Sequence, residues 1–209
     1  VLDQSRVSAD GKIGGGSIHI GGGYQGADPD LNNATATYIG SEVTIHADAS
    51  ESGDGGKVIV WADGTTRMYG QITAKGGSES GDGGFVETSG QYLDLGEHSP
   101  DVSAENGQGG EWLIDPYNLN IVASTGSNAT ASTTDTAEIF ESIASSAQVN
   151  VSLITNALDQ GSDVTLKTGV GGSEAGNINL LTTLDFNDIG IDRTLTFDAH
   201  NDVNLNSPI

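Results

Sequence analysis

The side chains best suited to bind a cation lie in two copies of the string SESGDGG, at residues 50–56 and 78–84. Each copy places two carboxylates beside glycine-rich turns, and oxygen ligands on flexible loops are what Ca²⁺ takes. The string also fits a simpler interpretation, a Gly/Asp turn that needs left-handed backbone dihedrals. Neither the EF-hand string nor the GGxGxDxUx repeat of calcium β-rolls is matched. The calcium candidates are Glu51, Asp54, Glu79 and Asp82.

No residues form a recognisable catalytic or zinc-binding motif. The four histidines show no HExxH spacing, and the chain has no cysteine to complete a zinc site. Acidic residues are abundant, but the seven lysines and arginines are scattered along the chain. Acid–base catalysis needs such groups together in one groove. We therefore predict no enzymatic activity, no catalytic residue and, calcium aside, no cofactor.

The charge of the chain argues against two classes of partner. With 29 acidic and 7 basic residues, the net charge is -22. Nucleic acid is not expected to bind, because no basic stripe is present to neutralise phosphates. Membrane insertion is not expected either, since no run approaches the roughly 20 apolar residues that a membrane helix needs. The absence of cysteine is compatible with export.

A degenerate repeat runs through the first half of the chain. Each copy has a β-branched residue, alanine two positions later, a polar turn, a glycine-rich string and another apolar segment. The copies begin at Val7, Ile45, Ile72 and Val102, which are 38, 27 and 30 residues apart. Propeller blades and leucine-rich repeats are more regular, so the spacing favours stacked coils with variable loops.

Short segments of alternating polarity indicate strands at residues 43–47, 57–62, 67–74 and 85–90. Because no helix long enough for a βαβ crossover is predicted in residues 1–130, parallel strands can connect only by winding into coils about 4.8 Å apart. The predicted fold class is all-β, a right-handed parallel β-helix (β-solenoid) of about eight to ten coils with one or two short helical insertions. An antiparallel sandwich is the alternative, but two-residue hairpin turns are sparse.

The second half is more varied and suggests three regions. Residues 1–122 are expected to form β-solenoid coils with GDGG-type repeats, residues 123–160 a loop plus helical insertion, and residues 161–209 further coils. Helical spacing predicts an amphipathic helix over residues 135–147 and a shorter one over 152–159 that ends at Gly161. Strands resume at 163–168, 177–182, 194–199 and 202–207. The strand-and-turn pattern continues up to both ends of the sequence, so the chain is expected to be a piece of a longer protein.

Residues 55–118 carry a more specific signal. The strings WADGTTRMYG, GDGGFVETSG and WLIDPYN occur there together, and they resemble hallmark segments of filamentous-haemagglutinin-like exoproteins, the secreted partners of two-partner secretion systems. The later DVTLKTG, GNINL and DVNLNSPI resemble the following coils of that family. The resemblance covers most of the chain from about Gly14 onward, but the N-terminal secretion-signal domain of the family is not evident.

The resemblance implies a right-handed β-helix, export through an outer-membrane pore partner, and a place on the cell surface of a Gram-negative bacterium. It also implies an adhesive, biofilm-forming or matrix role, with host or matrix surfaces as partners. Two other hypotheses remain open: a filament subunit that self-associates through its end coils, and a β-helix enzyme that degrades polysaccharides. Three N-x-S/T strings, a number that chance alone explains, could accept glycans. They begin at Asn33, Asn128 and Asn150.

Overall fold

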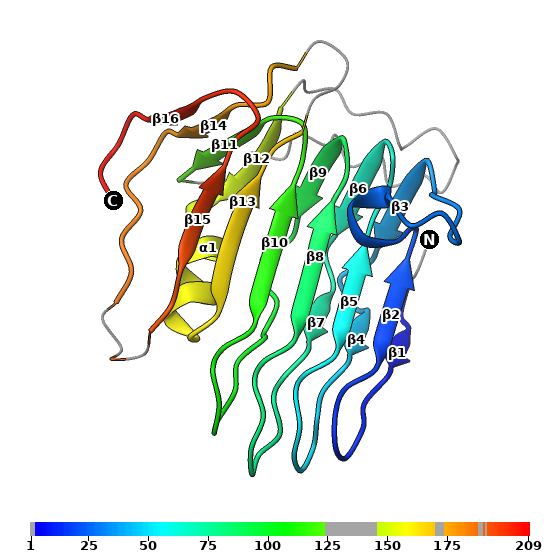
Figure 1. The fold of residues 1–209 in the computed structure, drawn as a ribbon. Coiled ribbons are helices and arrows are strands. Elements are labelled where there is room, and N and C mark those ends of the chain that lie inside the picture. The colour runs from blue at the N-terminus through cyan, green and yellow to red at the C-terminus, as the bar shows by residue number, and fades with distance from the viewer. Residues whose placement is uncertain (1–2, 124–145, 170–173, 188–189, 191) are drawn as a thin grey trace.

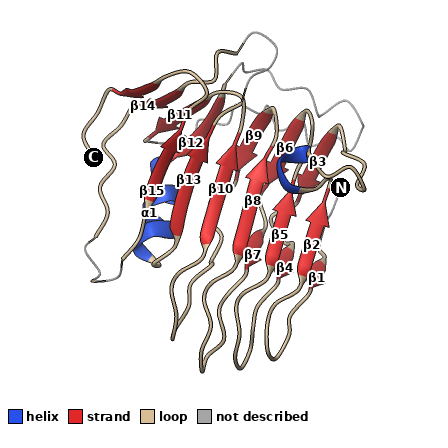
Figure 2. Cartoon of the chain, viewed as in Figure 1, coloured by secondary structure: helices blue, strands red, loops and turns tan. Residues whose placement is uncertain are grey.

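The structure is a computed structural model that describes residues 3–123, 146–169, 174–187, 190 and 192–209. Within these residues the fold is all-β apart from one α-helix and one 3-10 turn (Figures 1 and 2). The strands form four sheets, and every strand pairing is parallel. The parallel all-β prediction is confirmed, and the antiparallel sandwich is wrong.

The largest sheet has six strands in the order β15-β13-β10-β8-β5-β2. Its members are β2 (Ser17–Ile20), β5 (Lys57–Val60), β8 (Phe85–Ser89), β10 (Glu111–Asp115), β13 (Asp163–Lys167) and β15 (Leu195–Asp198).

The other three sheets lie beside it. One contains β1 (Arg6–Ser8), β4 (Thr44–His46) and β7 (Gln71–Thr73). A second contains β3 (Ala36–Ile39), β6 (Thr65–Met68) and β9 (Tyr92–Leu95). The third has the order β12-β11-β14-β16, with β11 (Leu119–Val122), β12 (Ala147–Asn150), β14 (Ile178–Leu180) and β16 (Val203–Leu205). The helical elements are η1 (Tyr24–Gly26) and α1 (Val151–Asp159).

The chain visits the sheets in turn and then returns to the first of them. It runs through β4, β5 and β6, and the next pass runs through β7, β8 and β9 in the same order. Each strand pairs with its counterpart one pass later, so Ile45 lies opposite Ile72 and Val58 lies opposite Val86. The repeat found in the sequence is therefore the unit that stacks.

The alternation of polarity places one set of side chains in a continuous core. The inward row of the six-stranded sheet stacks apolar residues on one another at strand spacing, which removes a narrow apolar column from water. In register, this row consists of Ile18, Val58, Val86, Trp112, Val164 and Leu195. Thr88 is also buried, and its hydroxyl accepts a hydrogen bond of 3.0 Å from the Trp112 indole.

The fourth copy of the repeat stacks in a different register from the one that its sequence suggests. A parallel bridge joins Thr73 to Asp101, so Val102 lies opposite Ala74 and not opposite Ile72. The side chain of Val102 is fully buried where the preceding passes place an alanine. Val102, which begins this copy, thus occupies the position of the alanine in the earlier copies. Packing against the preceding coil outweighs the sequence similarity between the copies.

Several predicted boundaries change in the structure. The segment 67–74, expected as one strand, divides into β6 and β7. Helix α1 confirms the helix expected at 152–159: the Asn150 side chain caps it by accepting a hydrogen bond of 2.9 Å from the Ser152 N–H, and Gly161 follows with φ +88°. Residues 135–145 of the longer predicted helix lie outside the described residues, and Ala147 belongs to β12 rather than to a helix.

The stacking order departs from the chain order at β12. This strand pairs with β11 and also lies beside β9, so a segment late in the sequence sits between two earlier strands (Figure 1). The longest described sheet has six strands, fewer than the eight to ten coils expected. The glycine-rich excursions lengthen each pass, so fewer passes fit into the same length of chain.

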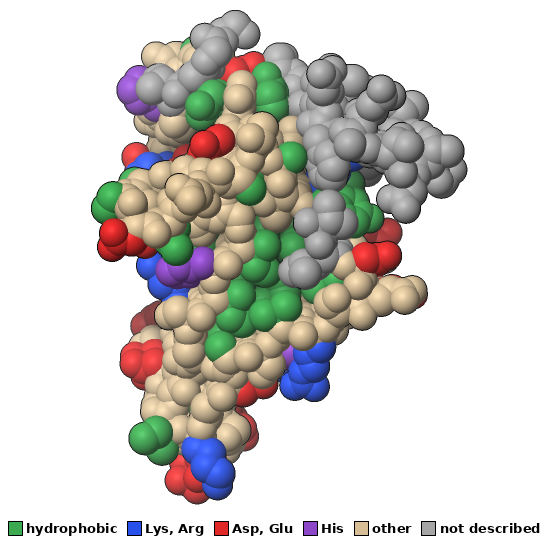
Figure 3. Space-filling view, turned by 90° about the vertical axis from the view of Figure 1, so that its right-hand side faces the viewer, with side chains coloured by type: hydrophobic (Ala, Val, Ile, Leu, Met, Phe, Trp, Pro, Cys, Tyr) green, Lys and Arg blue, Asp and Glu red, His purple; other side chains and the backbone are tan. Residues whose placement is uncertain are grey.

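The core reaches the surface at the end that carries β1, β2 and β3. Apolar side chains form a band across the middle of this end face (Figure 3). Val7, Ala9 and Ile20 belong to the core but are only partly buried. Among the described residues, no helix is long and apolar enough to span a membrane.

Candidate functional site

The glycine-rich strings form narrow fingers that project from one edge of the sheets (Figure 1). In each finger a glycine N–H closes the base by donating to the carbonyl of the preceding strand segment: Gly56 to Ala47 at 2.6 Å, and Gly84 to Ala74 at 2.7 Å. Neighbouring fingers touch through their backbones, since a Cβ at Gly83 would lie 1.8 Å from the Val102 carbonyl oxygen. Glycine is required there because no side chain fits between the fingers.

The calcium candidates lie on these fingers, and the carboxylates of Asp54 and Asp82 bind neighbouring backbones. Asp54 accepts a hydrogen bond from the Asp82 N–H, and Asp82 accepts one from the Gln108 N–H, both at 2.8 Å. Glu51 pairs with Lys12 at 2.6 Å. The described residues contain no group of three or more acidic, histidine or cysteine side chains that could hold a metal ion. Calcium binding stays a prediction.

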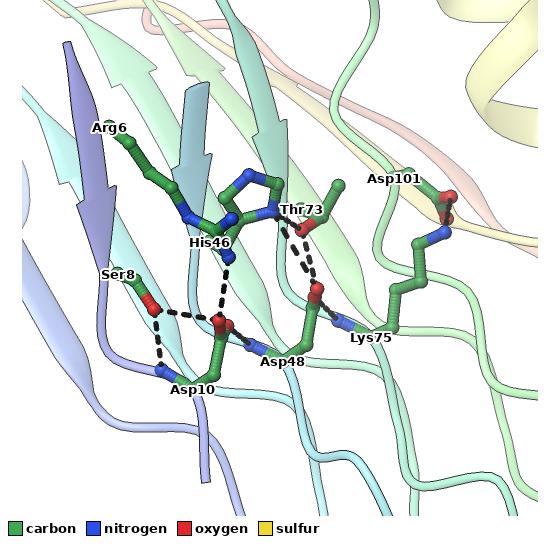
Figure 4. A network of polar contacts seen from close by, with 8 residues as sticks. All are labelled: Arg6, Ser8, Asp10, His46, Asp48, Thr73, Lys75 and Asp101. Atoms are coloured by element: carbon green, nitrogen blue, oxygen red, sulfur yellow. Dashed lines mark hydrogen bonds and ion pairs between the residues drawn. The ribbon is translucent and has the colours of Figure 1, made fainter. Parts of the chain in front are cut away.

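A second carboxylate ladder crosses the passes near the base of the fingers (Figure 4). Asp10 accepts from the Asp48 N–H at 2.9 Å, and Asp48 accepts from the Lys75 N–H at 2.7 Å. The Lys75 ammonium then pairs with Asp101 at 2.7 Å. Burial alone would raise the pKa of Asp101, but the hydrogen bonds from Lys75 and Ser103 outweigh it and lower that pKa. Asp101 therefore favours its ionised form, and the ladder ties successive passes together.

A groove of about 490 Å³ lies beside this ladder. Asp48, Lys75, Ser103 and Glu105 are among the residues that line it. Three of these four side chains are charged, and two of those are already engaged in the ladder. Most of the charged part of the groove wall is therefore already engaged in contacts within the protein.

Two carboxyls with strongly raised pKa values lie elsewhere, under a strap made of residues 21–34. The strap crosses the outward face of the six-stranded sheet and contains η1 (Figure 1). The backbone N–H of Gln25 donates to both carboxylate oxygens of Glu87 at 3.1 Å. The Gln25 side-chain amide donates to Asp115 at 3.1 Å. One strap residue therefore binds two carboxylates from adjacent strands, β8 and β10.

Aromatic contacts surround this pair. The Tyr24 ring packs edge-on against Phe85, with the ring centroids 5.8 Å apart. The Lys57 ammonium lies 4.8 Å from the Tyr24 centroid and 5.4 Å from that of Phe85. Gly26 rests on the Trp61 ring so closely that a Cβ would lie 2.5 Å from it. Glu87 is buried beneath this region, whereas Asp115 is only partly buried.

Burial is the main influence on both acids. It raises the pKa of Glu87 to about 7, and the nearby Asp115 charge acts in the same direction. Burial likewise raises the pKa of Asp115 to about 6; Lys167 opposes the shift, and Asp198 adds to it. Two adjacent carboxyls that titrate near neutral pH are the arrangement from which acid–base pairs are built. Here Glu87 is fully covered.

Sequence reasoning missed this pair. Glu87 falls in the predicted strand at 85–90, and alternation with Val86 placed it on the outward face, where an exposed glutamate is unremarkable. The sequence signal was the string GGGYQGADPDLNN, which is too long for a simple corner. No pattern in that string indicates which face it covers.

Two of the N-x-S/T asparagines have structural roles. The side-chain nitrogen of Asn33 donates to the Gly26 carbonyl at 2.9 Å and to Asp63 at 2.8 Å, which fastens the end of the strap. Asn150 caps α1. Asn128 lies outside the described residues.

In comparisons with known proteins, no family model matches the chain, and no curated protein matches it either.

Proposed function

We propose that this chain is a segment of a right-handed parallel β-helix in a secreted bacterial surface protein, with a structural and adhesive role. The main support is the stacking pattern: in the six-stranded sheet each strand pairs in parallel with its counterpart one pass later, and glycine fingers stack along the same edge. Such a fold extends by adding passes, which suits a stalk or fibre.

The family proposal is a filamentous-haemagglutinin-like exoprotein. It rests on the strings within residues 55–118, which fall on β6, β8 and β10 and on the segments beside them. On this proposal an outer-membrane pore partner exports the chain to the surface of a Gram-negative bacterium, where it contacts host or matrix surfaces. The surface is strongly acidic, with a net charge of -22, which favours contact with cationic partners.

Small-angle scattering and an adhesion assay test the two parts of the proposal. A solenoid segment gives an elongated scattering profile, and beads coated with the chain adhere to epithelial or matrix-coated surfaces above albumin-coated beads. Excess soluble chain should compete with that adhesion. A compact profile contradicts the architecture, whereas an elongated profile without competed adhesion contradicts only the adhesive role.

Self-association is a second candidate, favoured by the apolar band on the end face with β1, β2 and β3 (Figure 3). Unpaired strand edges with apolar side chains can accept another chain. Negative-stain microscopy separates the candidates, because stacking predicts fibres that lengthen with protein concentration. Uniform single particles at all concentrations contradict self-stacking.

The polysaccharide-degrading alternative now has a specific pair of residues to test, Glu87 and Asp115. If the chain cleaves polyuronates, Glu87→Gln should abolish product formation in a reducing-end assay. Equal background rates in the parent and in Glu87→Gln would count against this alternative.

A further inference from the structure

The strap of residues 21–34 closes over charge-bearing groups as well as apolar ones. Glu87 lies in register between Ile59 and Leu113, outward-facing residues that are 0% and 3% exposed. Gln25 has φ +52°, a backbone conformation that residues other than glycine seldom adopt. The same residue donates hydrogen bonds to both carboxylates. The strap therefore depends on the state of two titratable groups.

We propose that residues 21–34 form a pH-responsive cover, which protons on Glu87 and Asp115 hold closed and which ionisation of both carboxyls releases. Opening uncovers an outward surface on adjacent strands. That surface combines Trp61, Phe85 and the two apolar side chains with the two carboxylates.

The direction follows from proton linkage. In the closed state burial raises the pKa of Glu87 to about 7 and that of Asp115 to about 6, from ordinary values of 4.5 and 3.8. In an open state water reaches both carboxyls, so these values fall back. The closed state therefore binds protons more tightly, and the open state gains as the pH rises from about 4 to about 7. For Glu87 alone, this favours opening on the order of 100-fold.

Other groups face the same site and moderate the effect. Lys57 on β5 favours the ionised form of Glu87, and Lys167 on β13 favours that of Asp115. Asp198 on β15 opposes ionisation of Asp115. The hydrogen bonds that Gln25 donates also favour the ionised forms of both carboxyls. Burial outweighs these bonds and both lysines, so both pKa values remain raised. The remaining titratable groups on the strap or on this face are Tyr24, Asp28, Asp30, Asp63, His19, Glu111 and Asp163.

Quenching of a single tryptophan tests the proposal. The chain has two tryptophans, and Trp112→Phe leaves Trp61, which lies under Gly26. Acrylamide quenching of the Trp61 fluorescence should increase several-fold between pH 4.5 and pH 8.5. In a Glu87→Gln/Asp115→Asn variant the increase should disappear, because neither group can ionise.

Two matched controls exclude other sources of the pH effect. Glu111→Gln changes a carboxylate on the outward face of β10 that does not bind the strap. His19→Gln removes a histidine that lies in register with Ile59. Both variants should keep the parent's quenching profile. The proposal is overturned if the double variant shows the same pH-dependent rise as the parent.

Carbon-13 carboxyl NMR on the unaltered chain gives a second measurement that no folding defect can confuse. Titration midpoints for Glu87 and Asp115 should lie well above those of exposed carboxylates. Midpoints near 4 for both groups would mean that the strap does not sense pH.

Discussion

The corners that lead into β10 and β13 of the six-stranded sheet are built in two different ways. Before β10, a glycine finger closes when the Gly110 N–H donates to the Val102 carbonyl at 2.8 Å. Before β13, helix α1 takes that place, and the Ser162 N–H donates to the Ala157 carbonyl at 3.0 Å. The two strands nevertheless pair in register (Figure 1). The sheet therefore tolerates either corner.

The two corners differ in what stabilises them. Asp54 and Asp82 bind the backbones of adjacent fingers, so each finger depends on its neighbours. Helix α1 has its own backbone hydrogen bonds and an apolar face that enters the core. The buried residues of that face are Leu153, Ile154, Ala157 and Leu158. Stability is shared between passes in the first half and is local to one element at α1.

The side-chain ladders of the two halves differ as well. In the first half carboxylates accept from backbone N–H groups. In the second half the asparagines of β11, β14 and β16 bind one another: Asn204 donates to Asn179, and Asn179 donates to Asn120, both at 2.8 Å. Amide ladders carry no charge, so this part of the stack should be less sensitive to salt.

The largest expected effect comes from a finger glycine. Gly83→Ala forces a Cβ to within 1.8 Å of the Val102 carbonyl oxygen and 2.3 Å of the Gly110 nitrogen. Two fingers must separate, so we expect a loss of about 4 kcal/mol or more in the free energy of unfolding, or failure to fold. Gly169→Ala is the control, because its nearest neighbour is 3.9 Å away. Equal melting temperatures for the two variants would contradict close finger contact.

A core truncation in α1 should have the next largest effect. Leu158 is 1% exposed, and Leu158→Ala should lower the free energy of unfolding by about 3 kcal/mol through lost burial and a cavity. Urea denaturation measures the loss. Thr155→Ala on the less buried side of the helix is the control and should change stability little. Equal losses would show that the helix does not pack into the core.

The smallest effect is expected from a finger carboxylate. Asp82→Ala leaves the Gln108 N–H without its acceptor and should cost about 1 kcal/mol, because the site is exposed. Glu79→Ala in the same finger is the control, and the hydrogen-bond account predicts almost no change. Repeating both melts with calcium tests the cation hypothesis. A calcium-dependent stabilisation that either substitution abolishes would favour a metal site over a ladder.

The sequence predicted the repeating elements well because their cause is local. Alternating apolar residues and glycine-rich strings set strand and finger positions, and Asn150 with Gly161 sets the ends of α1. The register of Val102 was misjudged, because the choice depends on what the preceding pass places opposite it. The insertion of β12 between β9 and β11 has no local signal at all, since strand order is decided by contacts between distant segments.

The primary structure alone determined that strands are short, alternate in polarity and are separated by glycine-rich segments, because side-chain period and backbone freedom are properties of neighbouring residues. Only the folded chain decided that residues 21–34 cover Glu87 and Asp115. Burial, and with it the pKa of a carboxyl, depends on which remote segment displaces water from it, and no pattern within either segment records that contact.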